Sequence, residues 1–205
     1  DPSVAPKMSE ILKKQDLKKD TNFIEALINT LASFKVRDLK DFAVEHIKDA
    51  HTGVNNRQQL VLFLGRAGIT ESGDFLIERL KDEDEDTIIR AYACNSIASL
   101  DLKKAAPDID GVIKTIESYP FKKRQNYHKL YMHGIAALAK MGDERAYPRL
   151  INSSRSNNDT VRIQAIRLLK DIKGERTIDI LKHRMKYDPS PKVQSEARKA
   201  LKELG

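Results

Sequence analysis

Apolar residues return along this chain in triplets spaced as on one face of a helix. The first triplet is Leu27, Leu31 and Phe34, at positions i, i+4 and i+7 of an amphipathic α-helix. Equivalent triplets follow, and their central residues are spaced by 33, 33, 41, 31 and 32 residues. A fixed period of this size predicts a stacked array of helical repeats. The central residues are Leu31, Leu64, Ile97, Leu138, Leu169 and Leu201. We expect Leu64, Ile97, Leu138 and Leu169 to be buried between paired helices.

A second apolar pattern follows each triplet and predicts a second helix in every repeat. Gly68, Gly142 and Gly174 stand near the end of the first helix, where glycine commonly terminates a helix. Asp86 and Asp159 precede first helices and are predicted N-caps. No segment alternates with period two over enough residues to predict a strand. The apolar positions of the second helices are Ala43, Ile47, Leu76, Leu80, Ile109, Ile113, Leu150 and Leu181.

These patterns divide the chain into about five helical-hairpin repeats with a half-repeat at each end. We therefore predict one all-α domain over residues 1–205, a right-handed α-α superhelix. In the last four triplets the first residue is Ala or Gly, which lets a neighbouring helix approach closely. The repeats cover about 20–52, 53–85, 86–126, 127–157 and 158–189, and the half-repeats cover 5–14 and 190–205.

Three segments carry a recognisable repeat motif. They are Asp86–Arg90 with Ala93, Leu138–Asp143, and Asp159–Arg162 with Ala165. These segments resemble HEAT-like repeats, particularly the short type of the phycobilisome lyases. That type has an Asp-x-Val-Arg start, an alanine in the first helix and a Leu-Gly-Asp type of turn. The resemblance covers about residues 20–205 and implies an armadillo-like α-solenoid. It implies little about function, because one fold hosts many functions.

The chain departs from this motif in two respects. Arg162 is matched by Arg57 and Arg90, but the equivalent residues in the fourth and last repeats are Tyr131 and Gln194. The turn glycine is also absent from the first and third repeats. A regular ladder of aspartate and arginine side chains is therefore not expected.

Charge is unevenly distributed along the chain. Residues 1–144 hold 22 Lys+Arg and 23 Asp+Glu, a net charge of −1, whereas residues 145–205 hold 15 and 7, a net charge of +8. A basic segment favours an acidic protein, nucleic acid or another anionic surface as partner, or else consists of solvated helix faces. The apolar run Leu60–Leu64 is five residues long and no run exceeds it, which is far too short to span a membrane.

The third repeat is about eight residues too long, and the excess lies in the segment 117–128. Insertions in repeat proteins map to loops on one face, often the binding face. This insertion combines aromatic and cationic side chains, which suit stacking and pairing with anionic groups. The alternative is a longer connector whose Tyr119 and Phe121 tuck onto the core. The candidate binding residues combine this insertion with basic residues of later second helices. They are Tyr119, Phe121, Lys122, Lys123, Arg124 and Tyr127 in the insertion, and Arg149, Lys182 and Lys186 in the later helices.

No catalytic, metal or cofactor motif is present. His46 and His51 are five residues apart, as are His128 and His133, whereas a zinc-binding helix requires histidines four apart with an adjacent glutamate. Glycine-rich phosphate loops and Gly-x-Ser-x-Gly are absent. We therefore expect no cofactor, no metal and no enzymatic activity.

The remaining polar features have structural interpretations. Cys94, the single cysteine, lies beside Ala93 and Ile97 on a predicted helix and is expected to be a small buried hydrophobe. The acidic run Asp82–Asp86 is expected to be a solvated connector, with a docking site for a basic partner as the alternative.

The sequence thus favours a scaffold for protein–protein interaction, with an extended concave surface lined by the second helices. The expected partner is a protein, extended or acidic. One alternative is nucleic-acid or polyanion binding by the basic C-terminal third and the 118–128 insertion. A second, implied by the resemblance alone, is a lyase or chaperone-like subunit. Localisation is unknown: the cytoplasm is slightly favoured, and because the chain begins at Asp1 an exported product with a trimmed targeting segment stays open.

Overall fold

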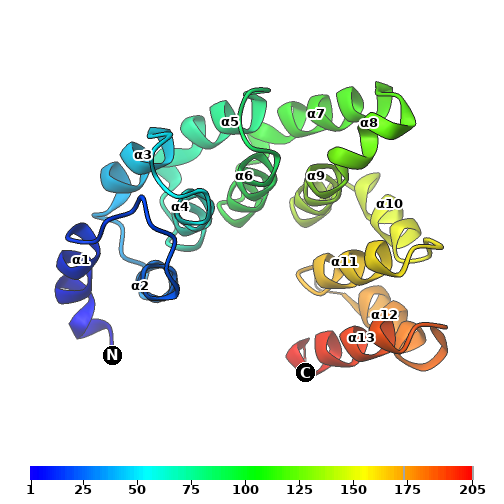
Figure 1. The fold of residues 1–205 in the computed structure, drawn as a ribbon. Coiled ribbons are helices and arrows are strands. Elements are labelled where there is room, and N and C mark those ends of the chain that lie inside the picture. The colour runs from blue at the N-terminus through cyan, green and yellow to red at the C-terminus, as the bar shows by residue number, and fades with distance from the viewer. Residues whose placement is uncertain (173, 205) are drawn as a thin grey trace. The chain divides into compact units, whose positions relative to one another are not determined.

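The structure, a computed structural model, describes residues 1–172 and 174–204. These residues form thirteen α-helices and three short 3-10 helices, with no strand (Figure 1). The all-α prediction is confirmed, as are the five helical hairpins with a single helix at each end. No helix among the described residues combines the length and apolarity that crossing a membrane requires. The α-helices are α1 (Ala5–Lys13), α2 (Asn22–Ser33), α3 (Lys40–Lys48), α4 (Val54–Arg66), α5 (Gly73–Lys81), α6 (Thr87–Ser99), α7 (Ala106–Ser118), α8 (Phe121–Asn126), α9 (His128–Lys140), α10 (Ala146–Ser153), α11 (Asp159–Leu169), α12 (Glu175–Tyr187) and α13 (Pro191–Leu204).

The helices group into two compact units, unit 1 (Asp1–Leu130) and unit 2 (Tyr131–Gly205). The single-domain arrangement over residues 1–205 stays a prediction, so each unit is described by itself.

In unit 1 the first helices of successive repeats stack directly on one another. α2 packs against α4 and α4 against α6, while α3 and α5 pack against α4 and α6 respectively. Figure 1 shows α2, α4 and α6 along the inner side of the bend of this unit, and α3, α5 and α7 along its outer side. We predicted that the second helices line the inner side; in unit 1 the first helices do. Leu64 and Ile97 are fully buried, as predicted, and the equivalent Leu31 is fully buried too.

Small side chains allow two of the first helices, α4 and α6, to pack closely. A Cβ atom added to Gly65 of α4 would lie 2.5 Å from the Cα atom of Ser96 on α6, so the two backbones meet closely. The hydroxyl of Ser96 donates a hydrogen bond of 2.7 Å to the carbonyl oxygen of Val61.

In the first four repeats the turn after the first helix keeps one backbone conformation, whether or not glycine is present. Gly68 and Gly142 have φ angles of 77° and 94°, the left-handed region that glycine tolerates best. In the two repeats without the glycine, Lys35 and Asp101 adopt φ angles of 58° and 50°. The backbone of the turn is therefore the same where another residue replaces glycine.

A side chain near the start of each of several first helices binds the end of the preceding second helix. Arg90 donates from Nε to the carbonyl oxygen of Leu80 at 2.9 Å, and Arg57 makes the equivalent bond one repeat earlier. Gln194 of α13 donates from Nε2 to the carbonyl oxygen of Asp188 at 2.7 Å. These bonds satisfy carbonyl groups that have no partner at a helix C-terminus. Gln194, which departs from the arginine motif, thus makes the same type of bond.

Unit 2 has its own apolar core. α11 and α12 both pack against α13, and α10 packs against α11. Leu138 and Leu169 are buried, as predicted. The N-cap of α11 is Asn158, whose side chain accepts from Thr160 and Val161, and not the neighbouring Asp159 that we predicted. The core between α11, α12 and α13 consists of Ile166, Leu181, Val193, Ala197 and Ala200.

Candidate functional site

The predicted insertion forms a short helix, α8, between two tyrosines. Tyr119 ends α7 in an extended conformation and Tyr127 follows α8, so the two rings meet with centroids 5.2 Å apart. The ammonium of Lys123 lies 3.7 Å from the centroid of the Tyr119 ring, a cation–π contact. The structure therefore brings together three of the predicted site residues.

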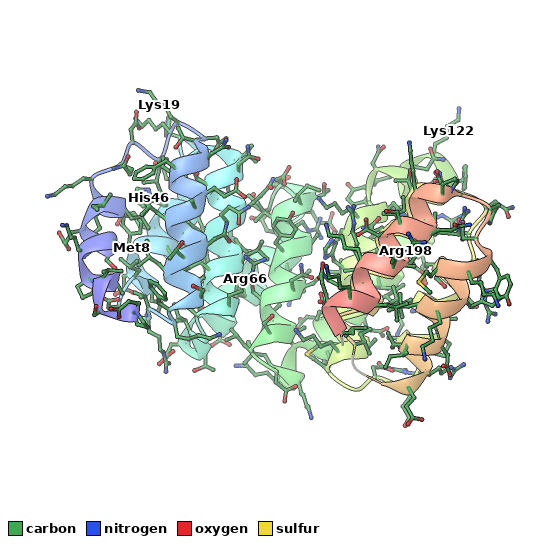
Figure 2. The ribbon with its side chains drawn as sticks, turned by 90° about the horizontal axis from the view of Figure 1, so that it is seen from below. Met8, Lys19, His46, Arg66, Lys122 and Arg198 are labelled. Atoms are coloured by element: carbon green, nitrogen blue, oxygen red, sulfur yellow. The ribbon has the colours of Figure 1, made fainter. Side chains whose placement is uncertain are left out.

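The outer surface of α8 presents one large aromatic side chain and three cations. Phe121 is 69% exposed and does not tuck onto the core. Lys122, Lys123 and Arg124 are also exposed, and Figure 2 shows Lys122 extending away from the ribbon. Within the described residues, Lys122 and Arg124 form no ion pair. Their charges are therefore available to an anionic partner.

A hollow of about 260 Å³ lies in unit 1 beside these residues. Its apolar lining comes from the exposed side of α7, and Tyr119 and Tyr127 form an aromatic wall. We call it the α7–α8 hollow. Its lining residues are Lys81, Glu83, Arg90, Pro107, Asp108, Gly111, Val112, Thr115, Ile116, Tyr119 and Tyr127.

Most of the charged and polar groups of the α7–α8 hollow already have partners. Lys81 pairs with Asp108 at 3.0 Å, and Thr115 donates to the carbonyl oxygen of Gly111 at 3.0 Å. Arg90 is buried and binds a helix end, as described above. Glu83 is exposed and has no ion-pair partner among the described residues. What remains open is an apolar and aromatic surface, which suits a side chain inserted by another molecule.

Sequence reasoning missed the helical wall of the α7–α8 hollow. Val112 lies between the core positions Ile109 and Ile113, so the apolar pattern of α7 gave no reason to single it out. The one signal pointing to this place was the 41-residue spacing of the third repeat.

The remaining predicted binding residues lie in unit 2. Arg149 is half-buried on α10, whereas Lys182 and Lys186 are exposed one turn apart on α12. The ammonium of Lys186 lies 4.9 Å from the centroid of the Tyr187 ring. Whether these residues bind a partner stays a prediction.

The acidic run is only partly a solvated connector. Asp86 caps α6 by accepting from Ile88 and Ile89, as predicted. Glu85 is buried, which corrects our expectation: its carboxylate accepts from Arg57 at 2.7 Å and from Arg79 at 3.4 Å. The arginines compensate the burial of the charge.

Cys94 is buried, as predicted, and its burial raises the pKa of the thiol to about 12. The thiolate, which is the reactive form, is therefore scarce at neutral pH. Across residues 1–172 and 174–204, no three His, Cys, Asp or Glu side chains are grouped so that they could hold a metal ion.

Comparison with known proteins supports the repeat architecture. Residues 128–202 match the family model described as HEAT repeats, which confirms the HEAT-like resemblance over that part of the chain. No curated protein matches the sequence.

Two solved structures contain a chain similar to this one. A chain from the complex of CpcE and CpcF of phycocyanin lyase from Nostoc sp. PCC7120 is 15% identical, with a TM-score of 0.48; the match covers 100% of this chain and 95% of that one. Human deoxyhypusine hydroxylase in complex with glycerol is also 15% identical, with a TM-score of 0.42, and the match covers 100% of this chain and 74% of that one. Neither likeness bears on the function of this chain.

Proposed function

We propose that this chain is a non-catalytic protein-binding scaffold and that unit 1 binds an acidic segment of its partner at the α7–α8 hollow. The observation that carries the proposal is that the Phe121 side chain is 69% exposed. It lies on α8 with three exposed cations, and this helix lies beside an apolar hollow. A large aromatic side chain exposed in this way is unfavourable in water, and aromatic anchors dominate the energetics of protein interfaces.

The surroundings of Phe121 define the chemistry of the partner. The apolar side of α7 with Tyr119 and Tyr127 accepts an apolar or aromatic side chain of the partner. Lys122 and Arg124 then meet acidic residues next to that anchor, which favours encounter and fixes orientation. This arrangement matches an extended acidic peptide segment.

The same surroundings support a binding role over a catalytic one. The hydroxyl of Thr115 is engaged with the backbone of its own helix, and the carboxylate of Asp108 is paired with Lys81. A nucleophile with an adjacent base, the usual arrangement for covalent catalysis, is not among the residues that line the hollow.

We predicted partner binding along an inner side lined by second helices; in unit 1 this inner side is formed by the first helices α2, α4 and α6 (Figure 1). Its polar side chains already bind one another across the helices: Gln59 donates to Glu25 at 3.3 Å and Arg66 to Asn29 at 2.8 Å. A partner on this face would have to replace these bonds. We therefore place the binding site at the α7–α8 hollow, and binding along the inner face stays a prediction.

Site-specific photo-crosslinking in cells tests the proposal. A photoreactive phenylalanine analogue is placed at Phe121 and, as the matched control, at Phe23 on α2, which is 55% exposed. We expect a specific protein to cross-link from position 121 and not from position 23. This cross-link should be lost when Val112→Arg, which blocks the hollow, is added. Equal cross-linking from both positions, or none from 121, would contradict the proposal.

A further inference from the structure

Two repeats contain the same buried group of charges, in which one carboxylate receives two arginines. In unit 1 the carboxylate is Glu85, with Arg57 from the first helix and Arg79 from the second. In unit 2 it is Asp188, which accepts from Arg162 at 2.9 Å through both oxygens and from Arg184 at 3.3 Å.

The two groups differ in how the second arginine is neutralised. Arg79 has two further carboxylates, Glu78 at 2.6 Å and Asp82 at 3.1 Å. The residues one before and three after Arg184 are instead His183 and Tyr187, whose rings lie 5.2 Å apart. Within the part of the chain that the structure describes, Arg184 pairs with no carboxylate other than Asp188, which Arg162 already occupies. The repeat in unit 2 thus retains a guanidinium charge that the repeat in unit 1 cancels.

Arg184 lines a hollow of about 240 Å³ between the end of α10 and one face of α12. Arg155 and Arg176 line it too, with Asp179 as its single carboxylate. Arg176 lies against the ring of Tyr147, with the guanidinium carbon 5.7 Å from the ring centroid. Neither Arg155 nor Arg176 forms an ion pair among the described residues. With three guanidinium groups and one carboxylate, the hollow has a formal charge of +2.

We propose that this hollow binds a phosphomonoester dianion, a site independent of the α7–α8 hollow. Guanidinium groups form paired, charge-assisted hydrogen bonds with phosphate oxygens, and they do so better than ammonium groups. A dianion would neutralise the formal charge of +2. A compact hollow of this kind fits one terminal phosphate, whereas a nucleic-acid strand requires a track of cations along its backbone.

The comparison between the repeats supplies a specific test. His183→Glu places a carboxylate where unit 1 has Glu78, so Arg184 should be neutralised and the dianion displaced. Lys182→Glu is the matched control, because it is adjacent on the same helix, changes the net charge by more, and does not line the hollow. Arg155→Gln is the second variant; it removes a guanidinium without touching the buried pair of Arg162 and Asp188.

The measurement is an NMR titration of the full chain with inorganic phosphate, with a capped phosphoserine tripeptide and with a single-stranded oligonucleotide. We expect phosphate and the tripeptide to cause saturable chemical-shift changes at the residues of the hollow. The affinity should be about tenfold lower in Arg155→Gln and in His183→Glu, the loss expected for one charged hydrogen bond. Tighter binding of the tripeptide than of phosphate would assign the dianion to a phosphorylated protein. An equal loss in Lys182→Glu, no saturation, or oligonucleotide binding stronger than the tripeptide would overturn the proposal.

Discussion

The guanidinium of Arg162 donates to both carboxylate oxygens of Asp188, each at 2.9 Å, where neither side chain reaches much solvent. The pair joins the first turns of α11 to the residue that ends α12, so it closes the helical hairpin of the fifth repeat. Burial raises the pKa of Asp188, but the hydrogen bonds from Arg162 and from the backbone of Ser190 outweigh it and hold the pKa below its ordinary value of 3.8.

Asp188→Asn should destabilise the protein by about 3 kcal/mol at neutral pH, because it leaves two arginines without their shared buried carboxylate. Chemical unfolding followed by circular dichroism measures the loss. Asp179→Asn on the same helix is the control, expected to change stability by less than about 0.5 kcal/mol. Equal effects of the two substitutions would contradict the assignment.

The contribution of Asp188 should also depend on pH. Its pKa is lower in the folded chain than in the unfolded chain, so acid protonates the unfolded chain first. The free energy of unfolding therefore decreases as the pH is lowered below about 4. The difference between wild type and Asp188→Asn should therefore be full at neutral pH and shrink as the pH drops through the folded-state pKa. A difference that grows in acid would show that the carboxylate is not stabilised in the folded state.

Leu138→Ala should lower the free energy of unfolding by about 2–5 kcal/mol, because Leu138 is 2% exposed and its truncation leaves a cavity. Val54→Ala, at a position that is 44% exposed, is the control and should change stability by about 0.5 kcal/mol or less. Thermal or urea unfolding of both variants gives the comparison. A cost for Leu138→Ala as small as that of the control would place the repeat register in doubt.

Gly65→Ala should destabilise by about 1–3 kcal/mol, because the added methyl group would collide with the backbone of Ser96. Gly111→Ala is the opposite case: a Cβ atom there has open space around it, and alanine is the better helix former by roughly 1 kcal/mol. Denaturant midpoints should therefore move in opposite directions. A stabilising Gly65→Ala would mean that α4 and α6 are not in close contact.

The fold was predictable from sequence because burial repeats with the helical period. Leu31, Leu64 and Ile97 could be aligned by spacing alone, and all three are fully buried. The turns at Lys35 and Asp101 could not be predicted, because residues other than glycine rarely adopt the positive φ angles found there.

The candidate site was predictable only in part. The excess length of the third repeat pointed to Tyr119 and Tyr127, but the wall from α7 depends on which side of that helix the neighbouring elements leave open. Glu85 was misjudged for a similar reason, since its partner Arg57 lies 28 residues away in sequence.

The affinity of the protein that cross-links from Phe121 tests the central claim most directly. Isothermal titration would compare wild type with Lys122/Lys123→Glu and with Lys13/Lys14→Glu, an exposed lysine pair at the C-terminal end of α1 that carries the same charge change. We predict that the reversal on α8 weakens binding by about tenfold or more and that the reversal on α1 leaves it unchanged. Equal affinities for the two variants would contradict a partner site at the α7–α8 hollow.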